Sequence, residues 1–294
     1  MAPVRVATRG SALARAQTDA VIARLGVPAE VVVVTTTGDR RTDTPIHALG
    51  GTGVFVKEVQ EAVLAGTADL AVHSAKDLPS VTAPGLVLAA VPERGDVRDA
   101  LVGSTLAALP TGARVGTGSV RRRAQLAALR PDLTFGELRG NIGTRLERAA
   151  DFDAVLVAAV ALDRLGLGTR ATDRLDPVTM LPQVGQGAIA VECRADDDRT
   201  RALLGPITDE PAHRAVTAER AFLAELGGGC SLPCGALAVA TATGVSIEVL
   251  LASLDGHTVV RTRATGTDPG AIGRRAAHDL LEAHGGRALL ESAP

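Results

Sequence analysis

The chain has 294 residues, which is enough for two or three domains with their own hydrophobic cores. Hydrophobic residues make up 46% and charged residues 22%, a composition typical of a globular rather than a disordered protein. The 31 Lys and Arg are balanced by 33 Asp and Glu, and the only aromatic residues are four Phe. The charge balance disfavours a broad nucleic-acid-binding surface, and the scarcity of aromatics disfavours base stacking.

The N-terminus and the cysteines indicate the compartment. MAPVRVATRG lacks the apolar core of a signal peptide, and the longest apolar run, 154–162, is shorter than the ~20 residues of a spanning helix. Three cysteines, an odd number, disfavour a disulfide framework. We therefore expect a cytoplasmic protein that binds neither membrane nor nucleic acid.

The first part of the chain alternates strands and helices. An apolar strand at 4–10 precedes a helix for which Ser11 is the expected N-cap. A strand rich in β-branched residues is predicted at 30–38, a helix at 54–66 and a third strand at 68–74. This order implies βαβ units in a mainly parallel sheet, with ligand-binding loops at the carboxyl ends of the strands.

A second set of alternating elements begins after PERGDVR (92–98), which we expect to act as a hinge. It includes helices predicted at 119–129 and 141–149. A Pro/Gly-rich segment, 182–187, then leads to a strand at 188–194 that we expect to return to the first lobe. The predicted fold therefore has two α/β lobes with mainly parallel sheets, one formed by 1–92 with 188–206 and the other by 96–184.

The last part of the chain has a different pattern. A strongly amphipathic helix is predicted at 210–226, with Gly227 as its C-cap. Three apolar stretches between 235 and 266 indicate an antiparallel meander, and 271–285 indicates a closing helix. We expect a smaller α+β domain over 210–294.

Two arginine-rich stretches, 116–130 and 138–150, point to anion binding. Each has a Gly-containing turn that enters a helix, where unpaired backbone N–H groups and the helix dipole favour a phosphate or carboxylate. Arginine adds a fork of donors at that point. An ordinary solvated helix surface is the alternative for either stretch taken alone.

Further polar residues lie at predicted strand ends. His73, Lys76 and Asp77 follow one strand, where Asp77 could stabilise a cationic charge or move a proton, or could be a turn residue. Arg9 and Ser11 follow another strand, where they form a second candidate anion site or an exposed arginine beside a helix cap.

The segment GGGC (227–230) places Cys230 in a glycine-rich loop, where its thiol could be an accessible nucleophile or attachment point. The alternative is a small buried apolar side chain. A metal site with Cys234 and Cys193 is disfavoured because no histidines cluster with them. LGGTG (49–53) is not a P-loop, and no GxGxxG with a downstream acid is present, so a nucleotide cofactor is also disfavoured.

Two functions fit these residues. One is an enzyme for a polycarboxylate substrate, with covalent attachment at Cys230. The other is a two-lobed protein that binds a small anion without catalysis. The second explains neither an accessible cysteine nor so many arginine-containing turns.

The chain closely resembles the porphobilinogen deaminase (hydroxymethylbilane synthase) family over most of 4–235. The likeness is carried, in family order, by ATRGS, HSAKDLP, VGTGSVRRRAQL, LRGNIGTRL, LPQVGQGAIAVECR and TAERAFLAELGGGC. The resemblance implies two lobes like those of periplasmic binding proteins and a monomeric transferase of porphyrin, heme and tetrapyrrole biosynthesis. Such enzymes join four porphobilinogen molecules head to tail on a covalent dipyrromethane, release four ammonia, and free linear hydroxymethylbilane by hydrolysis.

The resemblance also implies residue roles, with no metal. Asp77 matches the catalytic carboxylate, which stabilises the azafulvenium formed when ammonia leaves, and Cys230 matches the thioether attachment point. The other implied cofactor-binding residues are Lys76, Ser74, Thr117, Ser119, Arg121, Arg122, Arg139 and Gly140. The implied substrate-binding residues are Arg9, Ser11, Gln17, Arg145 and Arg164. Arg123 and Arg148 are expected on helix surfaces, and the chain departs from the family pattern at Ala48, Thr52 and Gly118.

Overall fold

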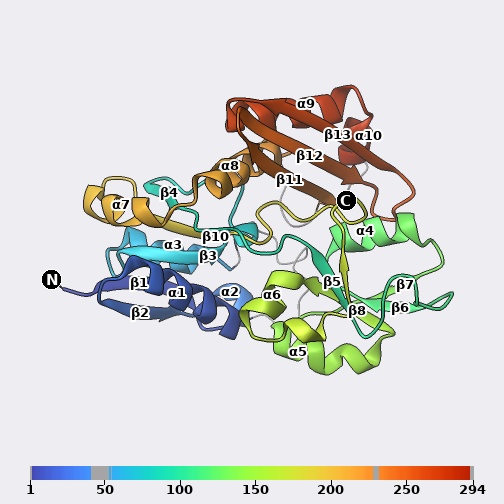
Figure 1. Ribbon diagram of the computed structural model, residues 1–294, viewed down its shortest axis with the longest axis horizontal. Coiled ribbons are helices and arrows are strands. Elements are labelled where there is room, and N and C mark those ends of the chain that lie inside the picture. Colours follow the sequence, from blue (N-terminus) through green and yellow to red (C-terminus); the bar gives the residue numbers. More distant parts are fainter. Residues whose placement is uncertain (1, 41–52, 54, 228–231, 292–294) are drawn as a thin grey trace.

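The computed structural model describes residues 2–40, 53, 55–227 and 232–291. They form two five-stranded sheets and one three-stranded sheet. In Figure 1 the first lobe, drawn in blue at the left, lies beside the second, drawn in green at the right, and the red C-terminal sheet lies above them. The expected two α/β lobes and separate antiparallel sheet are confirmed.

The first lobe contains a sheet of order β2-β1-β3-β10-β4. Its strands are β1 (Val4–Arg9), β2 (Ala29–Val34), β3 (Leu70–Ser74), β4 (Leu86–Ala90) and β10 (Ile189–Arg194), and its helices are α1 (Ala12–Leu25), α2 (Thr37–Arg40), α3 (Lys57–Leu64) and α7 (Asp198–Leu204). β10 pairs antiparallel with both β3 and β4, so this sheet is mixed rather than wholly parallel. The strand predicted at 30–38 is too long, because Thr37 donates its N–H and hydroxyl to Glu58 and begins α2 instead.

The second lobe repeats this plan with a sheet of order β7-β6-β8-β5-β9. Its strands are β5 (Asp99–Val102), β6 (Arg114–Gly116), β7 (Thr134–Gly136), β8 (Ala154–Ala158) and β9 (Asp173–Leu175), and its α-helices are α4 (Val120–Leu129), α5 (Ile142–Glu147) and α6 (Ala159–Arg164). Here β5 is the strand that runs antiparallel to its two neighbours. In each lobe, therefore, one antiparallel strand is inserted among parallel ones.

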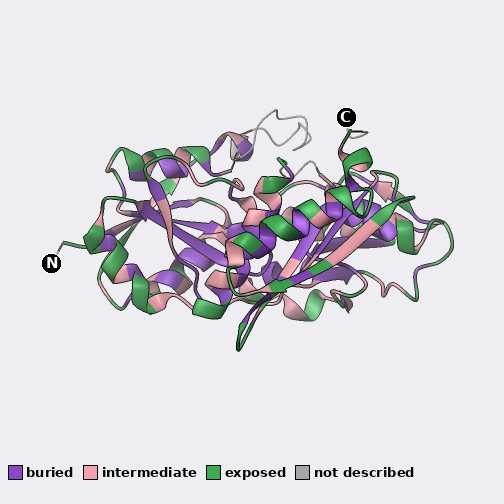
Figure 2. Ribbon diagram, turned by 90° about the horizontal axis from the view of Figure 1, so that it is seen from above, coloured by how far each residue is buried: buried purple, intermediate pink, exposed green. Residues whose placement is uncertain are grey.

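The C-terminal part packs helices on one antiparallel sheet. It consists of α8 (Glu210–Glu225), β11 (Cys234–Thr241), β12 (Gly244–Ala252), β13 (Val259–Gly266), α9 (Pro269–Glu282) and α10 (Gly286–Glu291). Gly227 has a φ of +65°, which suits the predicted end of the helix at α8. The core here is apolar and includes Phe222, Ile247 and Leu280, each fully buried. Figure 2 shows buried residues along the strands of all three sheets and exposed residues on the outer helix faces.

Two segments cross between the lobes. The first joins β4 to β5 and contains the predicted hinge, and the second joins β9 to β10. They lie side by side, since the N–H of Gly95 donates to the carbonyl of Gly187 at 3.1 Å. The strand predicted at 188–194 does return to the first lobe, as β10. The two lobes are thus connected by a paired double crossing.

Candidate active site

A cleft of about 440 Å³ lies between the two lobes. Its wall combines the ends of β1 and β3 in the first lobe with the helix starts that follow β6, β7 and β8 in the second. Carboxyl ends of parallel strands meet at one edge of a sheet, so both lobes turn their ligand-binding edges toward this space. The polar side chains in its lining are Arg9, Ser11, Thr35, Ser74, Lys76, Asp77, Arg122, Arg139, Asn141 and Arg145.

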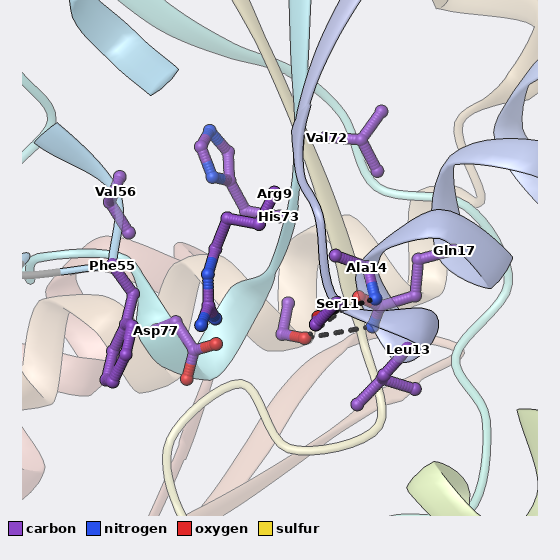
Figure 3. A pocket seen from close by; sticks show the side chains of 11 residues that line it. Arg9, Ser11, Leu13, Ala14, Gln17, Phe55, Val56, Val72, His73 and Asp77 are labelled. Atoms are coloured by element: carbon purple, nitrogen blue, oxygen red, sulfur yellow. Dashed lines mark hydrogen bonds between the residues drawn. The ribbon is translucent and has the colours of Figure 1, made fainter. Parts of the chain in front are cut away.

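The first-lobe side is organised by helix α1. Ser11 is its N-cap, with the side chain accepting the N–H of Ala14 at 3.2 Å. Gln17, six residues further on, is buried and exchanges hydrogen bonds of 2.9 and 3.0 Å with the hydroxyl of Ser74. These bonds, dashed in Figure 3, hold the end of β3 against α1 and so place the residues that follow Ser74.

A small cavity of about 50 Å³ adjoins the cleft and shares Arg9, Ser11, Phe55 and Asp77 with it. The guanidinium of Arg9 lies 4.3 Å from the centre of the Phe55 ring, a cation–π contact. Figure 3 shows the head groups of Arg9 and Asp77 pointing into the same space. The guanidinium of Arg9 and the carboxylate of Asp77 therefore face a cavity that is large enough for only a small group of atoms.

Lys76 and Asp77 lie in the short helix Ala75–Asp77 that follows β3. Burial and the nearby Arg122 lower the pKa of Lys76 to about 8, although Asp77 and Asp99 oppose the shift. Lys76 thus loses its proton more easily than an exposed lysine does. A carboxylate brought beside it would favour the charged form.

On the second-lobe side, α4 carries two adjacent buried arginines that share one carboxylate. Arg121 and Arg122 each approach Asp99 at 2.8 Å. Burial alone would raise the pKa of Asp99, but the two arginines outweigh it and hold that pKa well below its ordinary value. Only Arg122 also reaches the cleft.

The turn from β7 into α5 supplies the other cations. Gly140 has a φ of +103°, and a Cβ there would lie 2.9 Å from the side chain of Thr144, so only glycine fits. Nε of Arg145 donates to the Gly140 carbonyl at 2.9 Å. Burial, and to a smaller extent the positive charge of Arg122, lowers the pKa of Arg145 to about 10. The buried Nη1 of Arg139 has no hydrogen-bond partner among the described residues, which indicates a site prepared for an acceptor from a ligand.

Ten of the residues proposed from sequence line the cleft or its small cavity: Arg9, Ser11, Gln17, Ser74, Lys76, Asp77, Arg122, Arg139, Gly140 and Arg145. Four others lie outside this lining. Ser119 is the N-cap of α4 and Thr117 accepts the Ser119 N–H at 3.2 Å, so both shape the start of that helix. Arg121 is 3% exposed, and Arg164 donates to the carbonyl of Gly187 at the crossing.

Cys230 lies outside the described residues, as do Ala48 and Thr52. The side chains of Cys193 and Cys234 are buried. Among the side chains that the structure describes, no three His, Cys, Asp or Glu are grouped so that they could hold a metal ion. None of the described helices is long and apolar enough to cross a membrane.

Comparison with known proteins bears directly on this cleft. Residues 4–202 match the family model described as "Porphobilinogen deaminase, dipyromethane cofactor binding domain", and residues 213–282 match the model of the porphobilinogen deaminase C-terminal domain. The chain belongs to the porphobilinogen deaminase family. The porphobilinogen deaminase of Roseiflexus sp. (strain RS-1) is 50% identical over 296 residues, covering 97% of each chain. That of Acidothermus cellulolyticus is 48% identical over 294 residues, covering 95% of this chain and 89% of its own.

A solved structure of a periplasmic binding protein from Salmonella typhimurium overlaps with 72% of this chain and 94% of its own, at 13% identity and a TM-score of 0.39.

The cleft of this porphobilinogen deaminase family member fits a dipyrromethane. Such a group carries acetate and propionate side chains, for which arginine forks are the natural partners. The cleft offers Lys76, Arg122, Arg139 and Arg145 together, and the free Nη1 of Arg139 lacks an acceptor that such a carboxylate would supply.

Sequence reasoning missed three contributors to this site in the porphobilinogen deaminase fold. Phe55 packs on Arg9, and Asn141 caps α5 by accepting the N–H of Thr144 at 3.0 Å. Asn before a helical pattern is a recognisable N-cap signal. Asp99 begins the apolar strand DALV, and a carboxylate buried at such a position needs a cationic partner from elsewhere in the chain.

Proposed function

We propose that this protein is a hydroxymethylbilane synthase of tetrapyrrole biosynthesis. It joins four porphobilinogen molecules head to tail, releases four ammonia and frees linear hydroxymethylbilane by hydrolysis. The observation that carries the proposal is the pairing, in a member of the porphobilinogen deaminase family, of one carboxylate, Asp77, with a set of cations across a single interlobe cleft.

Asp77 is the proposed catalytic residue. As ammonia leaves the substrate, positive charge develops beside the pyrrole ring, and a carboxylate fixed on the short helix after β3 stabilises that charge. Arg9, with Ser11 nearby, binds the carboxylates of the incoming substrate at the small cavity next to Asp77. The hydrogen-bonded pair Gln17–Ser74 keeps this side of the cleft in place.

The opposite wall holds the dipyrromethane cofactor. When bound, this group supplies the free pyrrole carbon to which the first substrate is joined. Arg122, Arg139 and Arg145 bind its carboxylates from the second lobe, and Lys76 does so from the first. Its attachment through Cys230 is part of the proposal, and it rests on the match of this cysteine to the family's attachment position.

The proposal extends to organisation. We assign 1–92 with 188–206 to the first lobe, 96–184 to the second and 210–294 to the C-terminal domain. We also propose a monomer that acts in the cytoplasm, without metal.

Intact-protein mass spectrometry tests the proposal. The purified protein, or the protein after incubation with porphobilinogen, should carry an adduct of two pyrrole units, and Cys230→Ser should have the bare polypeptide mass after the same treatment. Cys234→Ser is the matched control and should keep the adduct. A wild-type protein that stays at bare mass and consumes no porphobilinogen would refute the proposal.

A further inference from the structure

The carboxylate of Asp99 is the centre of a buried polar cluster that the proposed reaction leaves without a role. Asp99 begins β5, directly after the first crossing segment, and its side chain has no exposed surface. Oδ2 lies 2.8 Å from Nη1 of Arg121. Oδ1 accepts Nε of Arg122 at 2.9 Å and Nε2 of Gln186 at 3.0 Å, and lies 2.8 Å from Nη2 of Arg122.

The two arginines that share Asp99 are not equivalent. Arg122 lines the interlobe cleft, and its Nη1 also donates to the carbonyl of Leu156 at 3.1 Å. Arg121 is absent from the cleft lining and directs Nη1 to the carbonyl of Leu181 at 2.7 Å as well as to Asp99. Arg122 therefore faces the cleft, whereas Arg121 lies in the protein interior, where its buried Nε and Nη2 have no hydrogen-bond partner among the described residues.

The charges of this cluster explain why both arginines are needed. Asp99 must be ionised to hold the fork of Arg122, and burying one carboxylate against one guanidinium at the cleft would cancel the cation that a ligand requires. With Arg121 as a second partner, the cluster keeps one net positive charge, and Arg122 presents it. Without Asp99, two adjacent guanidinium groups would face each other in a poorly solvated site.

Gln186 connects this cluster to the crossings. Its Nε2 donates to Asp99 and, at 2.7 Å, to the carbonyl of Val97. Val97 belongs to the first crossing segment and Gln186 to the second. The carboxylate that holds Arg122 is thus itself held by both connections between the lobes.

We propose that Asp99 is a positioning residue that holds the guanidinium fork of Arg122 at the cleft surface. Arg121 balances the charge of Asp99 and affects the ligand only through Asp99. This inference rests on the proposed function, because the ligand held by Arg122 is the dipyrromethane. It reassigns Arg121 from a ligand contact to a partner of Asp99.

The test compares Asp99→Asn with the double variant Asp99→Asn/Arg121→Gln. The double variant keeps the net single positive charge of the cluster but still lacks an ionised acceptor for Arg122. Two quantities are measured on the full chain: the melting temperature, and the porphobilinogen concentration that gives half-maximal two-pyrrole adduct by intact mass. Arg123→Gln, an exposed arginine of the same helix, is the matched control and should behave as wild type in both.

We expect Asp99→Asn to lower the melting temperature and to raise the half-loading concentration by about tenfold or more, the loss expected for a charge-assisted hydrogen bond. The double variant should recover most of the melting temperature and little of the loading. If loading returns together with the melting temperature, Asp99 only balances charge and the inference is wrong. Normal loading of Asp99→Asn would also overturn it.

If neither Asp99 variant folds, Gln186→Leu decides, because it removes a neutral donor and leaves every charge in place. The substitution removes the hydrogen bonds to Asp99 and to the Val97 carbonyl, so we expect the half-loading concentration to rise at least about threefold, and an unchanged value would overturn the inference. The wild-type arm separates this result from the proposed function. A wild type that never acquires the adduct contradicts the function, whereas equal loading of wild type and double variant contradicts only the role of Asp99.

Discussion

Arg94, in the first crossing segment, and Glu219, on α8, form a two-point ion pair with distances of 2.7 and 3.0 Å. Glu219 is fully buried and also accepts the backbone N–H groups of Gly185 in the second crossing and Ala238 in β11. One carboxylate therefore joins both crossings to the C-terminal sheet. The lobes and the C-terminal part meet at this point.

Replacing Glu219 by alanine should be strongly destabilising. Arg94 would lose its charged partner in a largely buried setting, and two backbone donors would lose their acceptor, so we expect a loss of about 3–5 kcal/mol in the free energy of unfolding. Urea denaturation measures this. Glu225→Ala, at an exposed position of the same helix, should change the free energy of unfolding by less than about 0.5 kcal/mol. Similar small losses for both variants would contradict this role of Glu219.

Asp77→Asn should remove the charge at the reacting centre while keeping the shape of the side chain. Because an uncharged amide stabilises developing positive charge poorly, kcat for ammonia release should fall by about 10²–10³-fold. The two-pyrrole adduct, once loaded, should remain visible by intact mass. Asp19→Asn, exposed on α1, is the control, and turnover of Asp77→Asn within a few-fold of that control would refute the catalytic assignment.

Lys76 predicts a pH dependence with a definite sign. Its pKa falls from 10.5 in a model peptide to about 8 in the folded protein without ligand, chiefly because of burial. Between these values the unfolded chain binds more protons than the folded one, so this residue makes stability rise with pH. Lys76→Met should therefore be more stable than the wild type below pH 8, and the advantage should shrink as the pH rises toward 10.5.

Urea unfolding of the cofactor-free proteins, prepared as Cys230→Ser, at several pH values checks this expectation. Lys57→Met, which removes the exposed lysine on α3, is the control for losing one lysine. An advantage of Lys76→Met that grows with pH would contradict the assigned direction. Cofactor loading, measured in the protein that keeps Cys230, should weaken as the pH rises, since a neutral Lys76 attracts carboxylates less.

Gly140→Ala should disturb the turn that carries the second-lobe cations. Alanine is strained at a φ of +103°, and its Cβ would also lie 2.9 Å from Thr144. Gly112→Ala is the matched control, because its φ of +77° brings similar strain but no described heavy atom lies within 4 Å of the new Cβ. We expect Gly140→Ala to cost at least about 1 kcal/mol more than Gly112→Ala and to weaken cofactor loading. Equal costs would show that crowding at Thr144 is unimportant.

Much of the architecture could be predicted from local patterns. The alternation of apolar strands with helical stretches indicates two α/β lobes, because burial of one helix face against a sheet leaves a periodic signature. The return of the strand at 188–194 to the first lobe was also predicted correctly. The insertion of an antiparallel strand in each sheet was not, since a fully buried strand has the same composition in either direction.

The candidate site, too, could be predicted only in part from local sequence patterns. Residues at strand ends, such as Arg9, Lys76 and Asp77, could be placed at a cleft because topology brings such ends together. The reason for glycine at position 118 could not be predicted from the sequence pattern. A Cβ there would lie 2.9 Å from the Leu138 carbonyl, which belongs to a neighbouring turn. The role of Arg121 could not be predicted, because adjacent helical residues differ in direction and only packing decides which one faces a cleft.

The sequence by itself determined the family of this protein and the residue types of its candidate site: one acid at a strand end, arginine-containing turns, and segments typical of the porphobilinogen deaminase family. Those properties depend on residue type and on short spacings, which the chain carries locally. The tertiary structure alone decided how the cations are used. Asp99, at the start of β5, pairs with both arginines of helix α4, so that Arg121 lies in the interior and Arg122 lines the cleft. A buried charge must find its partner through space, and that partner need not be near in the chain.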